Sequence, residues 1–106
     1  MNNSTEIFGI ALGLEKPWQV KDVRFEEVLG SRELHIHLTF ERGSKFMGND
    51  GKSYTAHDTV ERTWQHLNFF QHKCYLHAKV PRIVEKDGTT STQEVPWARK
   101  GSGFLN

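Results

Sequence analysis

Cysteine is almost missing from this sequence, since the 106 residues include only one, Cys74. A single thiol excludes an internal disulfide and any zinc site that takes two or more cysteines from one chain. Long apolar runs are missing as well, so we expect no transmembrane helix. The opening residues lack the basic start and the apolar run of a signal peptide, and a reducing cytoplasm is the default expectation for the compartment.

A strong excess of either charge is also missing. The chain has 14 Lys and Arg residues against 13 Asp and Glu, a net charge of +1 that six histidines can raise at lower pH. This balance neither requires nor excludes a nucleic-acid partner, so a basic surface must come from local clustering. The length suits a single domain that spans residues 1–106.

Motifs for catalysis are missing too. The sequence has no Walker-type phosphate loop, no nucleophile elbow and no convincing pair of carboxylates for acid–base work. Cys74 lies near His72 and His77, but on a strand it would point away from His77 and share a face with apolar residues. We predict that this thiol is buried and structural, and that the chain has neither enzymatic activity nor a cofactor.

The N-terminal residues have the spacing of a short helix. Asn3 and Ser4 can cap it, Gly13 should end it, and Pro17 forbids its continuation. A helix this short needs support from other elements. Its predicted packing stripe consists of the apolar residues Ile7, Ile10, Ala11 and Leu14.

From Val23 onward the apolar period changes to two, which indicates strands. Two half-buried strands should meet at a turn over Leu29–Arg32, and a Gly-rich loop should cover Gly43–Thr59. Further strands are expected over 64–68, 73–82 and 92–97. The predicted fold class is α+β, mostly antiparallel β hairpins with one short N-terminal helix. We divide it into a helix and lead-in (1–18), a β-rich body (19–98) and a tail or linker (99–106).

The strand over Lys73–Arg82 should have two different faces. Its apolar face joins a predicted core of Phe25, Ile36, Leu38, Trp64, Leu67, Phe69, Leu76, Val80 and Trp97. Its polar face mixes cations with an aromatic ring, which suits phosphate contact and stacking: Lys73, Tyr75, His77 and Lys79. Arg62, Trp64 and His66 are expected to extend that surface, and Arg82, Arg99 and Lys100 add charge. A solvated Lys-rich edge strand is the alternative interpretation.

A second candidate site is the pair His35 and His37 on the polar face of a strand. Two such imidazoles can bind zinc if other histidines supply further ligands, and a solvated pair is the alternative. The possible additional ligands are His57, His66, His72 and His77.

The chain resembles the N-terminal region of ISL-three-type insertion-sequence transposases. The shared features are W-x-H-L at Trp64–Leu67, C-Y-L-H-A-K-V-P-R at Cys74–Arg82, V-P-W-A-R and G-S-x-F within Val95–Phe104, and L-G-L…W-x-V-x-x-V at Leu12–Val23. The resemblance implies a DNA-binding module that precedes a helix-turn-helix segment and a DDE-type nuclease domain. It also implies a zinc-binding knob.

The sequence departs from the family at that knob. The positions that align with the four zinc ligands hold Met47, Asp50, Glu85 and Asp87, from which no thiolate site can form. The resemblance therefore implies a degenerate zinc-ribbon-like knob without metal, whose turn glycines Gly51 and Gly88 remain. A hard-cation site made of the three carboxylates is the alternative to solvated loop acids.

The resulting prediction is a non-catalytic DNA-binding N-terminal module of a transposase, which recognises or positions on the ends of a mobile element. Double-stranded DNA is the expected partner, and homo-oligomers are possible. The alternative is a docking or self-association module that has lost DNA contact.

Overall fold

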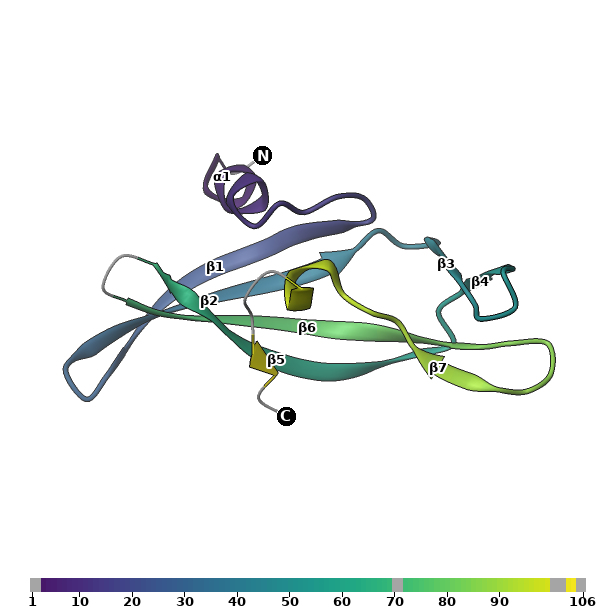
Figure 1. Cartoon of the computed structure of the whole chain (residues 1–106). Coiled ribbons are helices and arrows are strands. Elements are labelled where there is room, and N and C mark those ends of the chain that lie inside the picture. The colour runs from purple at the N-terminus through teal and green to yellow at the C-terminus, as the bar shows by residue number, and fades with distance from the viewer. Residues whose placement is uncertain (1–2, 70–71, 100–102, 105–106) are drawn as a thin grey trace.

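The computed structural model describes residues 3–69, 72–99 and 103–104, with side chains over 5–66 and 72–98 (Figure 1). The described part is mostly β-structure with one α-helix, in agreement with the predicted α+β class. The elements are α1 (Asn3–Ala11), β1 (Trp18–Val28), β2 (Ser31–Phe40), β3 (Lys45–Met47), β4 (Ser53–Thr55), β5 (Asp58–Phe69), β6 (His72–Val84), β7 (Thr90–Thr92), the 3-10 helix η1 (Pro96–Arg99) and β8 (Gly103–Phe104).

Two long hairpins form the main sheet, whose strand order is β1-β2-β6-β5-β8, with β7 paired to β6. The predicted antiparallel pairing is confirmed within β1–β2 and β5–β6. Between the hairpins, β2 and β6 run parallel, which the sequence did not indicate. The small second sheet, β3 and β4, interrupts the segment that was predicted to be a loop.

The β1–β2 hairpin follows from its sequence pattern. Its turn is shorter than predicted, because Leu29 and Gly30 alone connect the strands and both have positive φ, as a tight two-residue turn requires. The register shifts between Val20 and Asp22, so Lys21 is the extra residue of a β-bulge.

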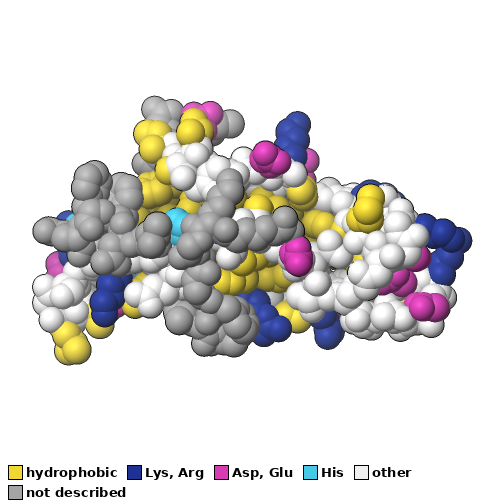
Figure 2. Space-filling model, viewed as in Figure 1, with side chains coloured by type: hydrophobic (Ala, Val, Ile, Leu, Met, Phe, Trp, Pro, Cys, Tyr) yellow, Lys and Arg dark blue, Asp and Glu magenta, His cyan; other side chains and the backbone are white. Residues whose placement is uncertain are grey.

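One face of the main sheet holds the core, and α1 and η1 lie on the same side of it (Figure 1). Trp97 of η1 packs edge-to-face against Trp18, with ring centroids 4.8 Å apart, and against Trp64 at 5.3 Å. In the view of Figure 2, hydrophobic side chains show in the centre of the molecule and Lys and Arg side chains lie toward its margins. Among the described residues, no helix is long and apolar enough to cross a membrane.

The predicted packing stripe of the helix is wrong except at Leu14, which packs against the core. Ile7 and Ile10 are largely exposed, whereas Leu12 is buried and Phe8 packs against the core. The side of the helix that meets β1 includes Gly9, whose ideal Cβ position lies at van der Waals distance, 4.0 Å, from the Val20 side chain.

Most of the predicted core is confirmed, with Ile36, Leu38, Trp64, Leu76, Val80 and Trp97 all buried. Phe25 is an error, since it is 47% exposed. It lies near the tip of the β1–β2 hairpin, where its ring contacts Arg32 and His72 instead of the core. The side chains of Leu67 and Phe69 lie outside the described set.

The C-terminal elements also differ from the prediction. No strand spans 92–97, because β7 covers only Thr90–Thr92 and Pro96 begins η1, a position that proline favours in helices. The predicted tail contributes β8, which pairs with β5 at Trp64 and Gln65. Residues 100–102 and 105–106 lie outside the described part of the chain.

Candidate nucleic-acid interface

The polar face of β6 lies on the side of the main sheet opposite the core cluster, and we call it the open face. The predicted alternation is confirmed: Cys74, Leu76, Ala78 and Val80 are buried. Because β6 lies between β2 and β5, it is a central strand of the sheet. The alternative interpretation, in which its lysines keep an exposed edge strand solvated, therefore does not apply. The predicted polar residues of β6 form the middle row of the open face: Lys73, Tyr75, His77 and Lys79.

The ends and the middle of this row differ in exposure. Lys73 and Lys79 are exposed, whereas Tyr75 and His77 are half-buried. His35 of β2 stacks on Tyr75 at 5.3 Å and on His77 at 5.0 Å, and His37 stacks on His77 at 4.7 Å. The Tyr75 ring therefore already has an aromatic neighbour, and the two lysines are the more accessible contact groups.

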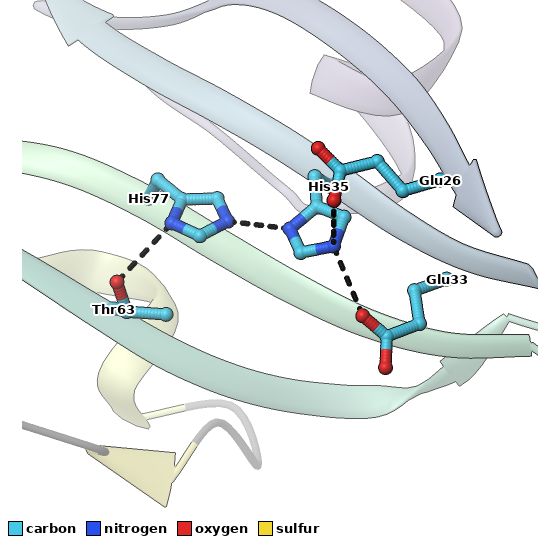
Figure 3. A network of polar contacts seen from close by, with 5 residues as sticks. All are labelled: Glu26, Glu33, His35, Thr63 and His77. Atoms are coloured by element: carbon cyan, nitrogen blue, oxygen red, sulfur yellow. Dashed lines mark hydrogen bonds and ion pairs between the residues drawn. The ribbon is translucent and has the colours of Figure 1, made fainter. Parts of the chain in front are cut away.

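Two of the stacked histidines, His35 and His77, belong to a chain of polar contacts that spans four strands (Figure 3). His35 Nδ1 and His77 Nε2 lie 2.8 Å apart, and His77 Nδ1 lies 3.1 Å from Thr63 Oγ1. His35 Nε2 lies 3.2 Å from Glu33 Oε1 and 3.6 Å from Glu26 Oε2. The arrangement fits neutral rings, with Thr63 donating to His77, His77 to His35, and His35 to Glu33.

Two protonated imidazoles could not share the His35–His77 contact, since both ring nitrogens would then be donors. In agreement with this, burial lowers the pKa of His77, and the neighbouring His37 and His35 lower it further. Burial also lowers the pKa of His66 on β5.

These lowered pKa values predict acid sensitivity of the fold. The unfolded chain takes up these protons near pH 6.5, whereas the folded chain takes them up only at lower pH, so stability is lost as the pH falls below about 6.5. The urea midpoint should therefore drop between pH 7.5 and 5.5, and His77→Gln should remove part of that drop. His57→Gln, at an exposed site outside the stack, is the control, and an equal effect of both variants would contradict the assignment.

The stack does not have the geometry of a metal site. His35 Nδ1 faces His77, and the rings lie nearly parallel instead of directing their nitrogens at one point. Over the described residues, no group of three or more His, Cys, Asp or Glu side chains is placed to hold a metal ion.

On β5, the predicted extension of the surface is wrong. Trp64 is buried in the core, and the residues that lie across from the polar row of β6 are Glu61, Thr63 and Gln65. Arg62 pairs with Ala78 at a point where β5 is the described edge of the sheet, so its side chain lines hollows on both sides of that edge. The prediction assigned Arg62, Trp64 and His66 to the polar face of β5, which in fact carries the residues between them. Because successive side chains on a strand point to opposite faces, an error of one residue exchanges the two faces.

Arg82, a further predicted contact residue, is engaged by an acidic neighbour on β5. Arg82 lies opposite Asp58 and donates two hydrogen bonds to its carboxylate, one of them Nε to Oδ1 at 2.7 Å. This pairing raises the pKa of Arg82 and lowers that of Asp58. The side chain of Arg99 and all of Lys100 lie outside the described set.

One basic residue of the open face was missed. Lys21 lines a groove together with His37, His77, Thr63 and Lys79. It reaches the groove from the β-bulge of β1. The signal was present in the sequence, because the apolar alternation of Trp18 and Val20 resumes at Val23, one residue out of step.

The knob, which we define as β3, β4 and the turn after β6, brings two of the four aligned ligand positions together. The backbone N–H of Asp50 donates to Glu85 Oε1 at 3.1 Å, and Glu85 is only 6% exposed. Met47 is 68% exposed, and Asp87 accepts a hydrogen bond from the Thr89 backbone at 2.9 Å. Gly51 and Gly88 both have positive φ and form the two turns.

Residues 50–84 match the zinc finger of the transposases IS204, IS1001, IS1096 and IS1165. The resemblance inferred from the sequence is thereby confirmed for about a third of the chain, which we call the zinc-ribbon segment. No curated protein and no solved structure matches the chain significantly.

The zinc-ribbon segment and its flanks do not supply the donors that a structural zinc requires. Such sites use four thiolate or imidazole ligands. The aligned positions offer one exposed thioether and three carboxylates, and the carboxylates of Asp50 and Asp87 already accept hydrogen bonds. The residues present do not fit a tetrahedral zinc ion.

Cys74 cannot substitute as a ligand or act as a nucleophile at neutral pH. It is buried in the core, and burial raises the pKa of its thiol to about 11. The predicted buried thiol is confirmed.

Proposed function

We propose that this chain is the DNA-binding N-terminal module of a transposase and positions the protein on the ends of a mobile element without catalytic activity of its own. The match of the zinc-ribbon segment supports the transposase assignment. The observation that supports DNA contact is the pair of exposed lysines on the open face. Lys73 and Lys79 are six strand residues apart, a span of about 20 Å, so they can reach different phosphates.

The two lysines are available for such contacts. In the described part of the chain, neither forms an ion pair. Lys21 and Arg62 line the same groove as Lys79. Acidic residues lower the positive electrostatic potential of the open face, because Glu33 lies across from Lys73 and Glu61 lies across from Lys79. We therefore expect few phosphate contacts and moderate affinity.

A titration of the protein against labelled duplex DNA at two salt concentrations tests this proposal. With two to four phosphate contacts, affinity should fall roughly 10- to 150-fold between 50 and 200 mM salt, because each contact releases counterions. Fluorescence anisotropy measures the dissociation constants. Absence of binding at 50 mM salt, or an affinity that ignores salt, would overturn the proposal.

A second candidate function, self-association with another copy of the chain, has one observation in its favour. The tip of the β1–β2 hairpin exposes three apolar side chains, Phe25, Val28 and Leu29, and β1 is an edge strand. Charged residues along β1, including the Arg24–Asp22 ion pair, oppose strand addition at that edge. Gel filtration over a range of concentrations separates the two functions, and a dimer without DNA affinity would favour self-association.

A further inference from the structure

Two tight turns face each other in the knob, at the places where the family resemblance implies zinc ligands. In the first, Gly51 N–H donates to Gly48 O at 3.0 Å, and Gly48 N–H donates to Lys52 O at 2.8 Å. In the second, Gly88 N–H donates to Glu85 O, and Glu85 N–H donates to Thr89 O, both at 2.8 Å. Backbone hydrogen bonds close each turn separately, and none of these bonds connects one turn to the other.

Side-chain hydrogen bonds join them. Asp50 N–H of the first turn donates to the Glu85 carboxylate of the second at 3.1 Å. Tyr54 O–H donates to the Asp50 carboxylate, and its oxygen accepts the backbone N–H of Lys86 at 3.1 Å. Tyr54 therefore bonds to both turns at once, and its hydroxyl uses both its donor and an acceptor site.

The contact between the turns is closely packed. Gly48 is buried, and a Cβ placed on it would lie 2.9 Å from the Tyr54 ring, 3.0 Å from Asp50 Oδ1 and 3.1 Å from Glu85 Cδ. These distances leave no room for a larger side chain. The side chains of Tyr54, Asp50 and Glu85 thus pack around Gly48, where only a glycine fits.

We propose that the cluster of Asp50, Tyr54 and Glu85, the latch, takes the structural role of zinc, so that the knob folds without a metal ion. Its hydrogen bonds connect the same two turns that an ion would connect. The two Asp50 oxygens are used by Tyr54 O–H and by the Lys52 N–H, which leaves this carboxylate poorly suited to metal. The inference is independent of DNA binding.

Metal content and thermal unfolding of the full chain test the metal-free fold. We expect less than a tenth of an equivalent of zinc by elemental analysis and an unchanged melting temperature when EDTA or zinc is added. Stoichiometric zinc, calcium or magnesium in the purified protein, or a melting temperature that EDTA lowers, would overturn the proposal.

A pair of matched substitutions tests the latch itself. Tyr54→Phe removes the hydroxyl that bonds to both turns, and we expect the melting temperature to fall by roughly 4–8 °C. Tyr75→Phe is the control, because the Tyr75 hydroxyl forms no hydrogen bond with the described side chains, and its effect should be less than about 2 °C. Equal shifts would contradict the latch.

A double substitution then tests whether the residues act as a unit. Asp50→Ala with Tyr54→Phe should lower the melting temperature by clearly less than the sum of the two single effects, because each single change already breaks their shared bond. Additive losses would show that Asp50 and Tyr54 act separately and would overturn the proposed latch.

Discussion

Replacing Trp97 by alanine is expected to lower the free energy of unfolding by roughly 3–5 kcal/mol. The indole is only 1% exposed and packs edge-to-face against both Trp18 and Trp64, so its removal would open a large cavity between η1 and the main sheet. Small domains have a total stability of about 5–15 kcal/mol, so this single change removes a large part of it. Urea unfolding measures the loss, with far-UV circular dichroism as the probe because the substitution itself changes tryptophan fluorescence.

Phe25→Ala is the control for that substitution. Phe25 has a similar aromatic character but lies half exposed at the hairpin tip, and we expect a loss of about 1 kcal/mol. If both variants lose the same stability, the three tryptophans are not the centre of the core.

Reversing both charges of the open-face lysine pair, Lys73→Glu with Lys79→Glu, should reduce duplex DNA affinity at least about tenfold at 50 mM salt. The change removes two phosphate contacts and replaces them with repulsion. The variant should keep its fold, since both side chains are exposed. Anisotropy titrations with one duplex give the comparison.

Lys16→Glu with Lys45→Glu changes the net charge by the same amount on exposed residues outside the open face. This control should retain most of the affinity, because phosphate contact depends on where the cations lie. Equal losses in both double variants would mean that the net charge alone, and not the open face, determines binding.

Alternation explains what the sequence could predict. Cys74 and Leu76 face the core, whereas Tyr75 and His77 lie on the open face. This difference can be read from neighbouring residues, because side-chain direction on a strand has a period of two. For the same reason the two faces of β6 and the β1–β2 hairpin follow from the sequence alone. On β5 the face was misassigned, since the apolar and polar residues around Trp64 do not alternate cleanly.

Long-range pairing explains what the sequence could not predict. The histidine stack exists because β2 and β6 run parallel and bring His37 beside His77, and no local pattern fixes that pairing. The knob is a similar case, since Tyr54 and Lys86 meet only after the two hairpins are assembled. The sequence shows that residues 1–106 contain too few cysteines for a thiolate zinc site, but it does not show the hydrogen bonds that join the turns.

The salt dependence of DNA affinity, compared between the original chain and Lys73→Ala with Lys79→Ala, tests most directly whether the open face contacts phosphate. Plotted as the logarithm of affinity against the logarithm of salt concentration, the slope should become shallower by about 1.8, the value for two lost phosphate contacts. An unchanged slope would place DNA elsewhere on the molecule and contradict the account.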